Sequence, residues 1–301
     1  MSEETIERTF EISSPVRLSV SNIRGSVEVR PGQDDRVKVL AVKHTDTGDA
    51  ERTHIEIEQK EDGSVEIRTR YDLHDHHFCN STRPCRVEYT VEAPAECSLR
   101  LNTVSSSADV SGLKGNVKVD SVSGSVTLHD LAGHLELDVV SASASLQRIN
   151  GPLVIQAVSG DVRLAEADSD SIQASTVSGN LDLEIPLRKG PYTMRSVSGT
   201  IHLTVPGETG CRVIMSTISG HIRTDMPMTV FSRKFGHQYA EIQGGGVAVH
   251  VDTVSGDFIL GHTGEIKTPS KIHQSAQERC EVLERISTGE ITVEEALNQL
   301  K

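Results

Sequence analysis

The sequence predicts an all-β protein: a β-solenoid with two short strands per coil of about 18 residues, preceded by irregular β-strands and followed by a small α-helical hairpin. Three observations predict this class. A corner tripeptide recurs along the chain, apolar residues repeat with a period of nine, and the period becomes helical only in the last thirty residues.

The corner tripeptide is Val-Ser-Gly or a close variant of it. It begins at residues 104, 122, 140, 158, 177, 197, 218 and 254, in steps of 18, 18, 18, 19, 20, 21 and 36 residues. Steps of such regular length are typical of stacked coils, in which each repeat covers the one before it.

A finer period of nine lies within each coil. In eight successive frames of nine residues that start at Cys97, the third, fifth and eighth positions are apolar in all 24 cases. The fourth and sixth positions are polar in 14 of 16 cases. Because alternation of this kind indicates a half-buried strand, each frame is expected to be one strand and one corner, with the third, fifth and eighth side chains pointing inward.

The serines of the tripeptide have two possible roles. A Ser between Val and a small residue suits a tight corner, where stacked hydroxyls bond to one another or to backbone groups. The same hydroxyls would be nucleophiles in a hydrolase. We expect the structural role, and we predict no catalytic residue and no cofactor-binding residue in this chain.

The chain is expected to divide into four regions. These are residues 1–96, whose strands open and cap the solenoid, residues 97–262 with the regular repeats, a linker at 263–271, and the helical hairpin at 272–301. The first region carries the nonapeptide register at Leu18 and Val27 and a hairpin turn at Asp62-Gly63. Its strands should cover the open edge at one end of the stack.

The last thirty residues have helical spacing. Their apolar residues repeat as in an amphipathic helix from Ile272 to Ile286, and Thr292 with Glu295 forms a capping box for a second short helix. A hairpin of this size does not usually fold alone, so it either caps its own solenoid or docks on another chain. We expect association with a protein partner or a second copy, giving a homo-oligomer, because apolar residues lie on more than one helix face.

Charge and hydropathy exclude several classes of partner. A formal net charge of −13 argues against binding to nucleic acid. No apolar run approaches 18 residues, so no direct membrane insertion is expected. Five scattered cysteines and an acidic start without an apolar leader favour reduced thiols and a cytoplasmic location.

The repeats resemble the bacterial β-strand-repeat family called "putative adhesin" or Toastrack, a family of unknown function. The resemblance rests on the recurrent Val-Ser-Gly phrase and on "GGGVAVHVDTVSGDFIL" at 244–260, and it covers roughly residues 10–262. The tail phrase "VLERISTGEITVEEALNQL" is similar to bacterial SHOCT-type helical hairpins. The resemblance implies a non-enzymatic structural or interaction module linked to envelope-stress or membrane-associated signalling. Many relatives have a transmembrane segment, whereas this sequence contains none.

One loop suggests a different chemistry. The stretch "YDLHDHHFCNSTRPC" places His74, His76, His77, Cys79 and Cys85 within twelve residues, and these side chains bind zinc and other transition metals. Its spacing matches no standard zinc finger, so a solvated loop and a Cys79–Cys85 disulfide remain alternatives. If the site is real, the alternative function is a metal-binding sensor or a metal-dependent enzyme centred on residues 74–85.

Overall fold

A computed structural model of the chain describes residues 3–12, 15–33, 35–72, 83–207, 209–234 and 236–263. By its internal contacts the chain divides at residue 263, and the fold reported below is that of the first unit, Met1–His262. The predicted helical hairpin at 272–301, with its SHOCT-like phrase, lies outside the described residues. Among the described residues no helix is long and apolar enough to cross a membrane.

Most of the described residues are in β-strands, which confirms the all-β class, and the one helical element among them is a short 3₁₀ turn at Thr45–Thr47. The strands are β1 (Glu3–Glu11), β2 (Val16–Pro31), β3 (Arg36–His44), β4 (Thr53–Gln59), β5 (Val65–Tyr71), β6 (Arg86–Ala93), β7 (Cys97–Ser111), β8 (Val117–Ala132), β9 (Leu135–Asn150), β10 (Leu153–Ala157), β11 (Val162–Ala165), β12 (Ile172–Thr176), β13 (Leu181–Glu184), β14 (Tyr192–Ser196), β15 (Ile201–Pro206), β16 (Cys211–Thr217), β17 (Ile222–Thr224), β18 (Met228–Lys234), β19 (His237–Ile242), β20 (Val247–Thr253) and β21 (Phe258–Thr263).

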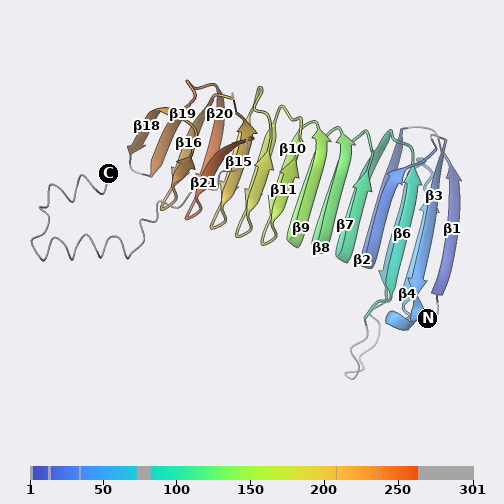
Figure 1. Ribbon diagram of the computed structural model, residues 1–301. Helices are drawn as coiled ribbons and strands as arrows, with labels where there is room; N and C mark the ends of the chain where they lie inside the picture. Colours follow the sequence, from blue (N-terminus) through green and yellow to red (C-terminus); the bar gives the residue numbers. More distant parts are fainter. Residues whose placement is uncertain are drawn as a thin grey trace, which may run out of the picture. The chain divides into compact units, whose positions relative to one another are not determined.

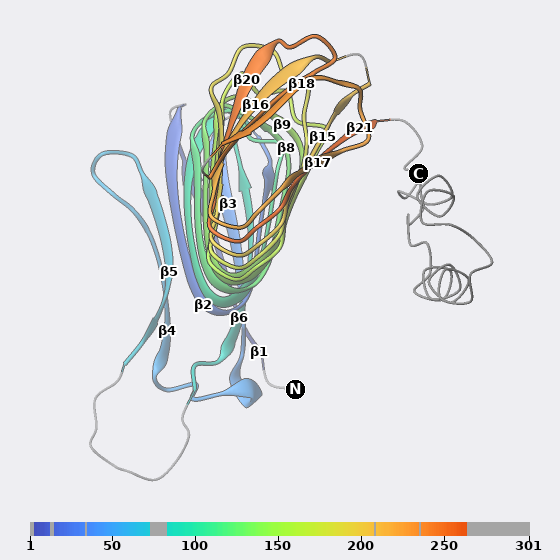
Figure 2. The same cartoon turned by 90° about the vertical axis from the view of Figure 1, so that its left-hand side faces the viewer.

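The chain winds so that each coil contributes one strand to each of two faces (Figure 1, Figure 2). On the first face, Leu99 of β7 pairs with Val117 of β8, Val117 with Leu135 of β9, and Leu135 with Leu153 of β10, always in parallel. On the second face, Leu146 of β9 lies beside Leu164 of β11. The offset between paired residues is the 18 residues that the repeat predicts, so the strands of successive coils stack about 4.8 Å apart.

The third and fifth positions of the frames point inward, as predicted. Leu101, Leu128, Leu137 and Leu146 are at most 1% exposed, and all of them belong to one continuous apolar core. Each such side chain stabilises the fold by up to about 1.5–3 kcal/mol before entropy is deducted. Strand alternation therefore fixes which residues fill the narrow interior.

The eighth position behaves differently at the two corners of a coil, and the prediction that it always points inward is wrong. Leu131 and Ile149 are buried at one corner, whereas Val122 and Val140 are exposed at the Val-Ser-Gly corner. The cause is backbone conformation. At the first corner the residue before position eight has a left-handed φ, for example 53° at Arg148, and this turns the following side chain inward. At the Val-Ser-Gly corner the strand alternation continues, so the side chain of the valine faces outward.

The glycine of the tripeptide is required by close packing between coils. A Cβ on Gly160 would lie 1.7 Å from the carbonyl oxygen of Ala142 in the preceding coil, and one on Gly179 would lie 2.0 Å from that of Gly160. Neither glycine has a positive φ. At these two corners the limit is therefore steric, because the neighbouring backbone occupies the space of a side chain, whereas Gly124 at an earlier corner also has a positive φ of 125°.

We expect Gly160→Ala to lower the free energy of unfolding by at least about 2 kcal/mol, since the stacked backbones must separate to admit the methyl group. The control is Gly261→Ala, because a Cβ at Gly261 meets no heavy atom within 4 Å. That variant should stay within about 0.5 kcal/mol of the parent in urea denaturation. Equal midpoints for the two variants would contradict the close approach.

Neither end of the regular stack is formed by the first or last coil of the sequence. The first coil, β2, pairs with β7 on one side and with β5 and β6 on the other. The last coil is inserted in the same way: β20 lies between β14 and β16, and β21 lies between β15 and β17. Both terminal coils of the repeat are therefore held on two sides.

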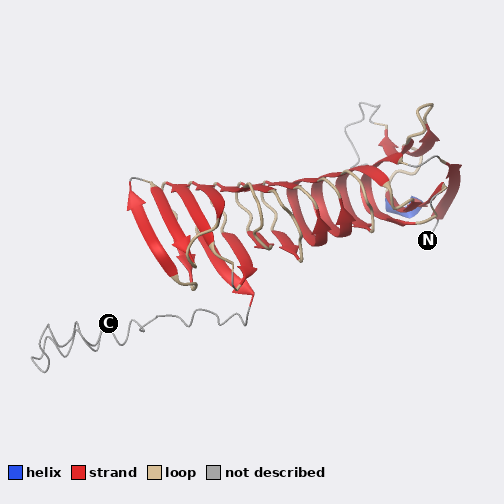
Figure 3. Ribbon diagram, turned by 90° about the horizontal axis from the view of Figure 1, so that it is seen from above, coloured by secondary structure: helices blue, strands red, loops and turns tan. Residues whose placement is uncertain are grey.

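Antiparallel strands cover the ends of the stack (Figure 3). At the amino-terminal end β6, β3 and β1 pair antiparallel, and β4 and β5 form the predicted hairpin. At the other end the long interruption between Asp225 and Gly246 forms the hairpin of β18 and β19, which extends the first face beyond β16.

Candidate functional site: a groove along the valine corner

A long groove of about 980 Å³ runs beside the Val-Ser-Gly corner, across the strands of the first face. It lies between two columns of outward-pointing side chains, because at this corner of each coil the sixth and eighth positions face solvent and the seventh faces the core. One wall is apolar and one is polar. The apolar wall is formed by Ile23, Val104, Val122, Val140, Val158, Val177, Val197 and Val254.

The apolar wall is uniform along its length. Its seven valines are each between 44% and 47% exposed, and together with Ile218 they make up most of the large apolar side chains that are exposed among the described residues. Each of eight coils contributes one residue to this wall. Because neighbouring strands lie about 4.8 Å apart, these residues form a continuous stripe about 34 Å long. A stripe of this kind on an otherwise polar surface is typical of a binding site.

The floor of the groove is made of the seventh positions, which are small and buried: Thr103, Ser121, Val139, Ala157, Thr176, Ser196 and Thr253. Their hydroxyls are satisfied inside the protein. Thr103 donates to the Oγ of Ser121 at 3.0 Å, and Thr253 donates to the Oγ1 of Thr217 at 2.9 Å. Because these polar atoms already have partners, the floor offers a ligand surface contact and few free hydrogen bonds.

The polar wall is charged in part of its length. Asp120 and Asp138 are register partners on neighbouring coils, and Lys118 lies 3.5 Å from Asp138. Partial burial, followed by the neighbouring Asp120 carboxyl, raises the pKa of Asp138, while Lys118 acts in the opposite direction. Further along, the Nε of Arg195 lies 3.4 Å from a carboxylate oxygen of Asp252. The wall therefore combines acidic positions with one cation.

The corner serines beside the valine column act as structural residues, as predicted. Ser123 donates to the carbonyl oxygen of Val104 at 3.0 Å, and Ser159 lies 3.3 Å from that of Val140. Ser141 and Ser159 share a hydrogen bond at 3.3 Å. Each of these hydroxyls therefore ties one coil to the next, and in this part of the chain no histidine bonds to them as a general base would.

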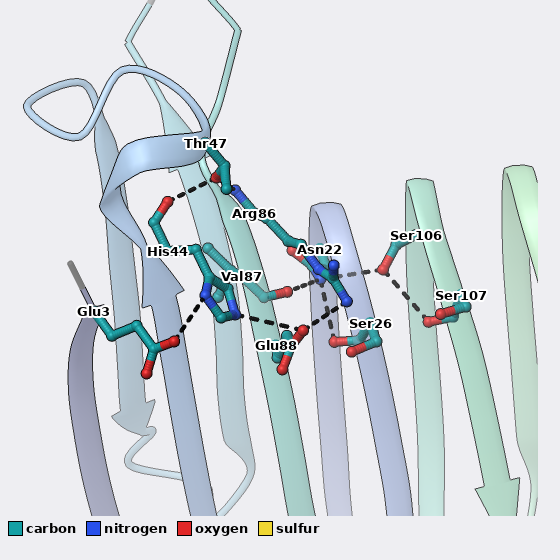
Figure 4. A network of polar contacts seen from close by, with 10 residues as sticks. All are labelled: Glu3, Asn22, Ser26, His44, Thr47, Arg86, Val87, Glu88, Ser106 and Ser107. Carbon is teal, nitrogen blue, oxygen red and sulfur yellow. Dashed lines mark hydrogen bonds and ion pairs between the residues drawn. The ribbon is translucent and has the colours of Figure 1, made fainter. Parts of the chain in front are cut away.

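A polar network joins the amino-terminal cap to the first coil beside the end of the groove (Figure 4). The amide of Asn22 donates to the carbonyl oxygen of Val87 at 2.9 Å and to the Oγ of Ser106 at 3.1 Å. His44 on β3 lies between two carboxylates, with Nδ1 3.3 Å from Glu3 and Nε2 3.4 Å from Glu88. The network fixes β1, β3 and β6 against the coil that begins the groove.

Of the predicted metal ligands, only Cys85 is among the described residues. Its side chain is fully buried, and its backbone N–H donates to the Oγ1 of Thr53 at 3.0 Å. His74, His76, His77 and Cys79 lie outside the described residues, so the zinc site stays a prediction. Cys85 is a free thiol, which contradicts the Cys79–Cys85 disulfide. Within the described ranges no three His, Cys, Asp or Glu side chains are arranged to hold a metal ion.

The cysteines that the structure describes are free thiols in the interior. Burial raises the pKa of Cys97 to about 12 and that of Cys211 to about 11. Such thiols remain protonated at neutral pH and behave as small apolar core residues. Their free state agrees with the reduced thiols expected from the sequence; the cytoplasmic location stays a prediction.

The fold and the groove together define a class of protein: a coil of stacked strands that carries a surface groove and, in the described residues, no recognisable catalytic centre. The chain belongs to the Toastrack DUF4097 family, whose model matches residues 16–260. The family resemblance of the repeats is thereby confirmed. No curated protein matches the chain.

Solved structures share the fold at low sequence identity. A "putative lipid binding protein" from Parabacteroides distasonis has a TM-score of 0.51 and 14% identity, covering 86% of this chain and 97% of the other. A "putative adhesin" from Bacteroides fragilis has a TM-score of 0.48 and 9% identity over 85% and 97% of the two chains. Another from Parabacteroides merdae has values of 0.47 and 11% over 87% and 97%. These similarities concern the fold alone.

Proposed function

We propose that this protein is a non-enzymatic binding module whose groove holds one long apolar chain, such as the acyl chain of a lipid. The observation that carries the proposal is the uniform column of half-exposed valines along one wall of the groove. Covering an apolar surface with an apolar ligand removes both from water, which is favourable in proportion to the area covered.

The shape of the groove favours a slender ligand over a second protein. A stripe about 34 Å long and about 10 Å wide covers roughly 340 Å² per copy, or about 700 Å² for two copies. Stable protein interfaces bury about 1,200–2,000 Å² in total. A single hydrocarbon chain, by contrast, needs only a narrow apolar channel. The name of the Parabacteroides distasonis protein, which refers to lipid binding, agrees with this choice.

The test is binding of a long-chain fatty acid, measured by isothermal titration calorimetry. Val140→Asp together with Val158→Asp should weaken binding by at least about tenfold, because two charges replace apolar contacts in the centre of the groove. Since both valines are half-exposed, the free energy of unfolding should change little.

The control is Ile259→Asp, which places one such charge on the outward side of β21, away from the groove, and is compared with Val140→Asp alone as well as with the double variant. This variant should bind the fatty acid as the parent does. If the parent shows no saturable binding, or if the control loses affinity as much as the groove variant, the groove is not the ligand site.

We also propose that residues 272–301 mediate association with a protein partner or with a second copy. The support is the helical repeat of apolar residues in a segment too short to fold alone. Light scattering should give a multiple of the chain mass for the full chain and the monomer mass for a chain ending at Thr268; monomers in both cases would refute the idea. A role in envelope-stress signalling rests on the family resemblance alone.

The metal-dependent alternative centred on residues 74–85 is tested by elemental analysis of untagged protein. Close to one zinc ion per chain, lost when Cys79 and Cys85 are both replaced by Ser, would support it. Protein that stays metal-free after incubation with zinc would leave only the interpretation as a solvated loop.

A further inference from the structure

Both ends of the stack finish in strands with an unpaired edge. Among the described residues β1 pairs only with β3, and β18 pairs only with β19. These two strands lie at opposite ends of the row of strands in Figure 1. An edge strand offers a row of backbone N–H and C=O groups to another strand, and proteins usually shield such edges.

The carboxyl-terminal edge, β18, combines apolar and basic residues. All seven of its residues are exposed, and Met228, Val230 and Phe231 are between 44% and 51% exposed. Arg233 and Lys234 follow at its end, and in the described part of the chain no acidic side chain pairs with them. This edge therefore suits an extended strand that is apolar in one half and acidic in the other.

The amino-terminal edge, β1, has the complementary pattern. Its sequence EETIERTFE carries four glutamates and one arginine, with Ile6 and Phe10 on the face that packs toward the core. Glu3 and Glu4 already contact His44 and Lys43, at 3.3 Å and 3.1 Å, yet their side chains remain 47% and 53% exposed. Each carboxylate can therefore accept a second cation.

We propose that β18 of one copy pairs antiparallel with β1 of the next, so that the protein assembles head to tail. One register places Phe231 opposite Ile6, Arg233 opposite Glu4 and Lys234 opposite Glu3. In this register, residues on the core side of β18 lie opposite residues on the core side of β1, and basic residues lie opposite acidic ones. Phe231 and Arg233 are register partners of the buried Ala240 and Gln238, so they lie on the core side of β18. Ile6 and Glu4 lie on the core side of β1, opposite the buried Ala41 and Lys43.

Symmetric pairings of the same edges are less favourable. Two copies of β1 would bring glutamates together, and like charges on paired strands are destabilising. Two copies of β18 centred on Phe231 would place Lys234 opposite Met228, with no opposite charge for either cation. The pairing of unlike edges is heterologous, so each assembly keeps a free β1 at one end and a free β18 at the other, and it continues as a filament unless it closes into a ring.

The contact is one strand pair wide, smaller than a standard interface, so assembly should be weak and concentration-dependent. Sedimentation velocity of the full chain at low salt should show a mass that rises with protein concentration. The rise should diminish at high salt, because the pairs of Arg233 and Lys234 with glutamates are near the surface and are screened.

Charge reversal tests the register. Arg233→Glu with Lys234→Glu makes both edges acidic, and Glu3→Lys with Glu4→Lys makes both edges basic. Each double variant alone should associate at least about tenfold more weakly than the parent. An equimolar mixture of the two should regain assembly, since every contact then joins an acidic edge to a basic one. This recovery separates the proposal from a folding defect in either variant.

The control is Lys114→Glu with Arg163→Glu, two exposed cations away from both edges that make no ion pair in the described part of the chain; it should assemble as the parent does. The proposal is overturned if the parent stays monomeric at all concentrations, if the control loses assembly equally, or if the mixture does not recover. Assembly that ignores all of these charge changes would also overturn it and would point to residues 272–301 instead.

Discussion

Leu137→Asp is expected to lower the free energy of unfolding by more than about 4 kcal/mol. Leu137 is fully buried on β9, between Val119 of the coil before it and Ile155 of the coil after it. The substitution removes most of the apolar contact of a leucine, which by itself costs about 2–5 kcal/mol when the side chain is truncated. It also places a carboxyl group where no polar partner lies, and a buried unpaired charge costs more still. Urea denaturation followed by circular dichroism measures the loss.

The matched control lies one residue away. Glu136 faces outward on the same strand and pairs with Lys118, so Glu136→Gln keeps the shape of the side chain and loses one surface ion pair. That change should cost less than about 1 kcal/mol. Similar losses for the two variants would mean that the inward and outward faces of β9 are wrongly assigned.

Ending the chain at Gly246 is expected to unfold the carboxyl-terminal part of the stack. This truncation removes β20 and β21, which lie between the coil of β14 and β15 and the coil of β16 and β17. It deletes the fully buried Val249, Val251 and Phe258 and leaves four strands without one of their neighbours. Each lost apolar side chain is worth up to about 1.5–3 kcal/mol. Hydrogen exchange should show fast exchange from Cys211 to Ile242.

A chain that ends at Thr263 is the control, because it retains both inserted strands in full. Its melting temperature and its exchange pattern in Cys211–Ile242 should match those of the full chain. If the chain ending at Gly246 were equally protected, β16 would have re-paired directly with β14, and the insertion of the last coil would not be needed for stability.

The sequence predicts the regular part of this fold because one local rule repeats. Apolar residues at the third and fifth positions of each frame alternate with polar ones, and a strand places alternate side chains on opposite faces. Leu137 and Leu128 could therefore be assigned to the core, and their coils aligned at an offset of 18 residues, without a structure. The serine ladder follows from the same repetition, since identical corners stack on one another.

The groove along the valine corner was not predicted, although most of its residues belong to the repeat. The period of nine residues is the same at both corners of a coil, so it predicts the same side-chain direction at both. The chain distinguishes them through the left-handed backbone at positions such as Asp130 and Arg148, which are not glycines and give no strong local signal. Half of the apolar eighth positions are thus buried and the other half form the valine wall. One signal was available: the valines of the wall and Ile218 are all followed by Ser, although Ile23 is followed by Arg24.

The sequence by itself determined the strand period, the inward side chains of each strand and the need for small residues at the corners. Only the tertiary structure decided that Val140 faces solvent, that β20 and β21 are inserted between earlier coils, and that β18 ends as an open edge. The physical reason is that alternation is a property of neighbouring residues in one strand. Corner direction and coil order, by contrast, depend on backbone dihedral angles and on pairings between segments far apart in the chain.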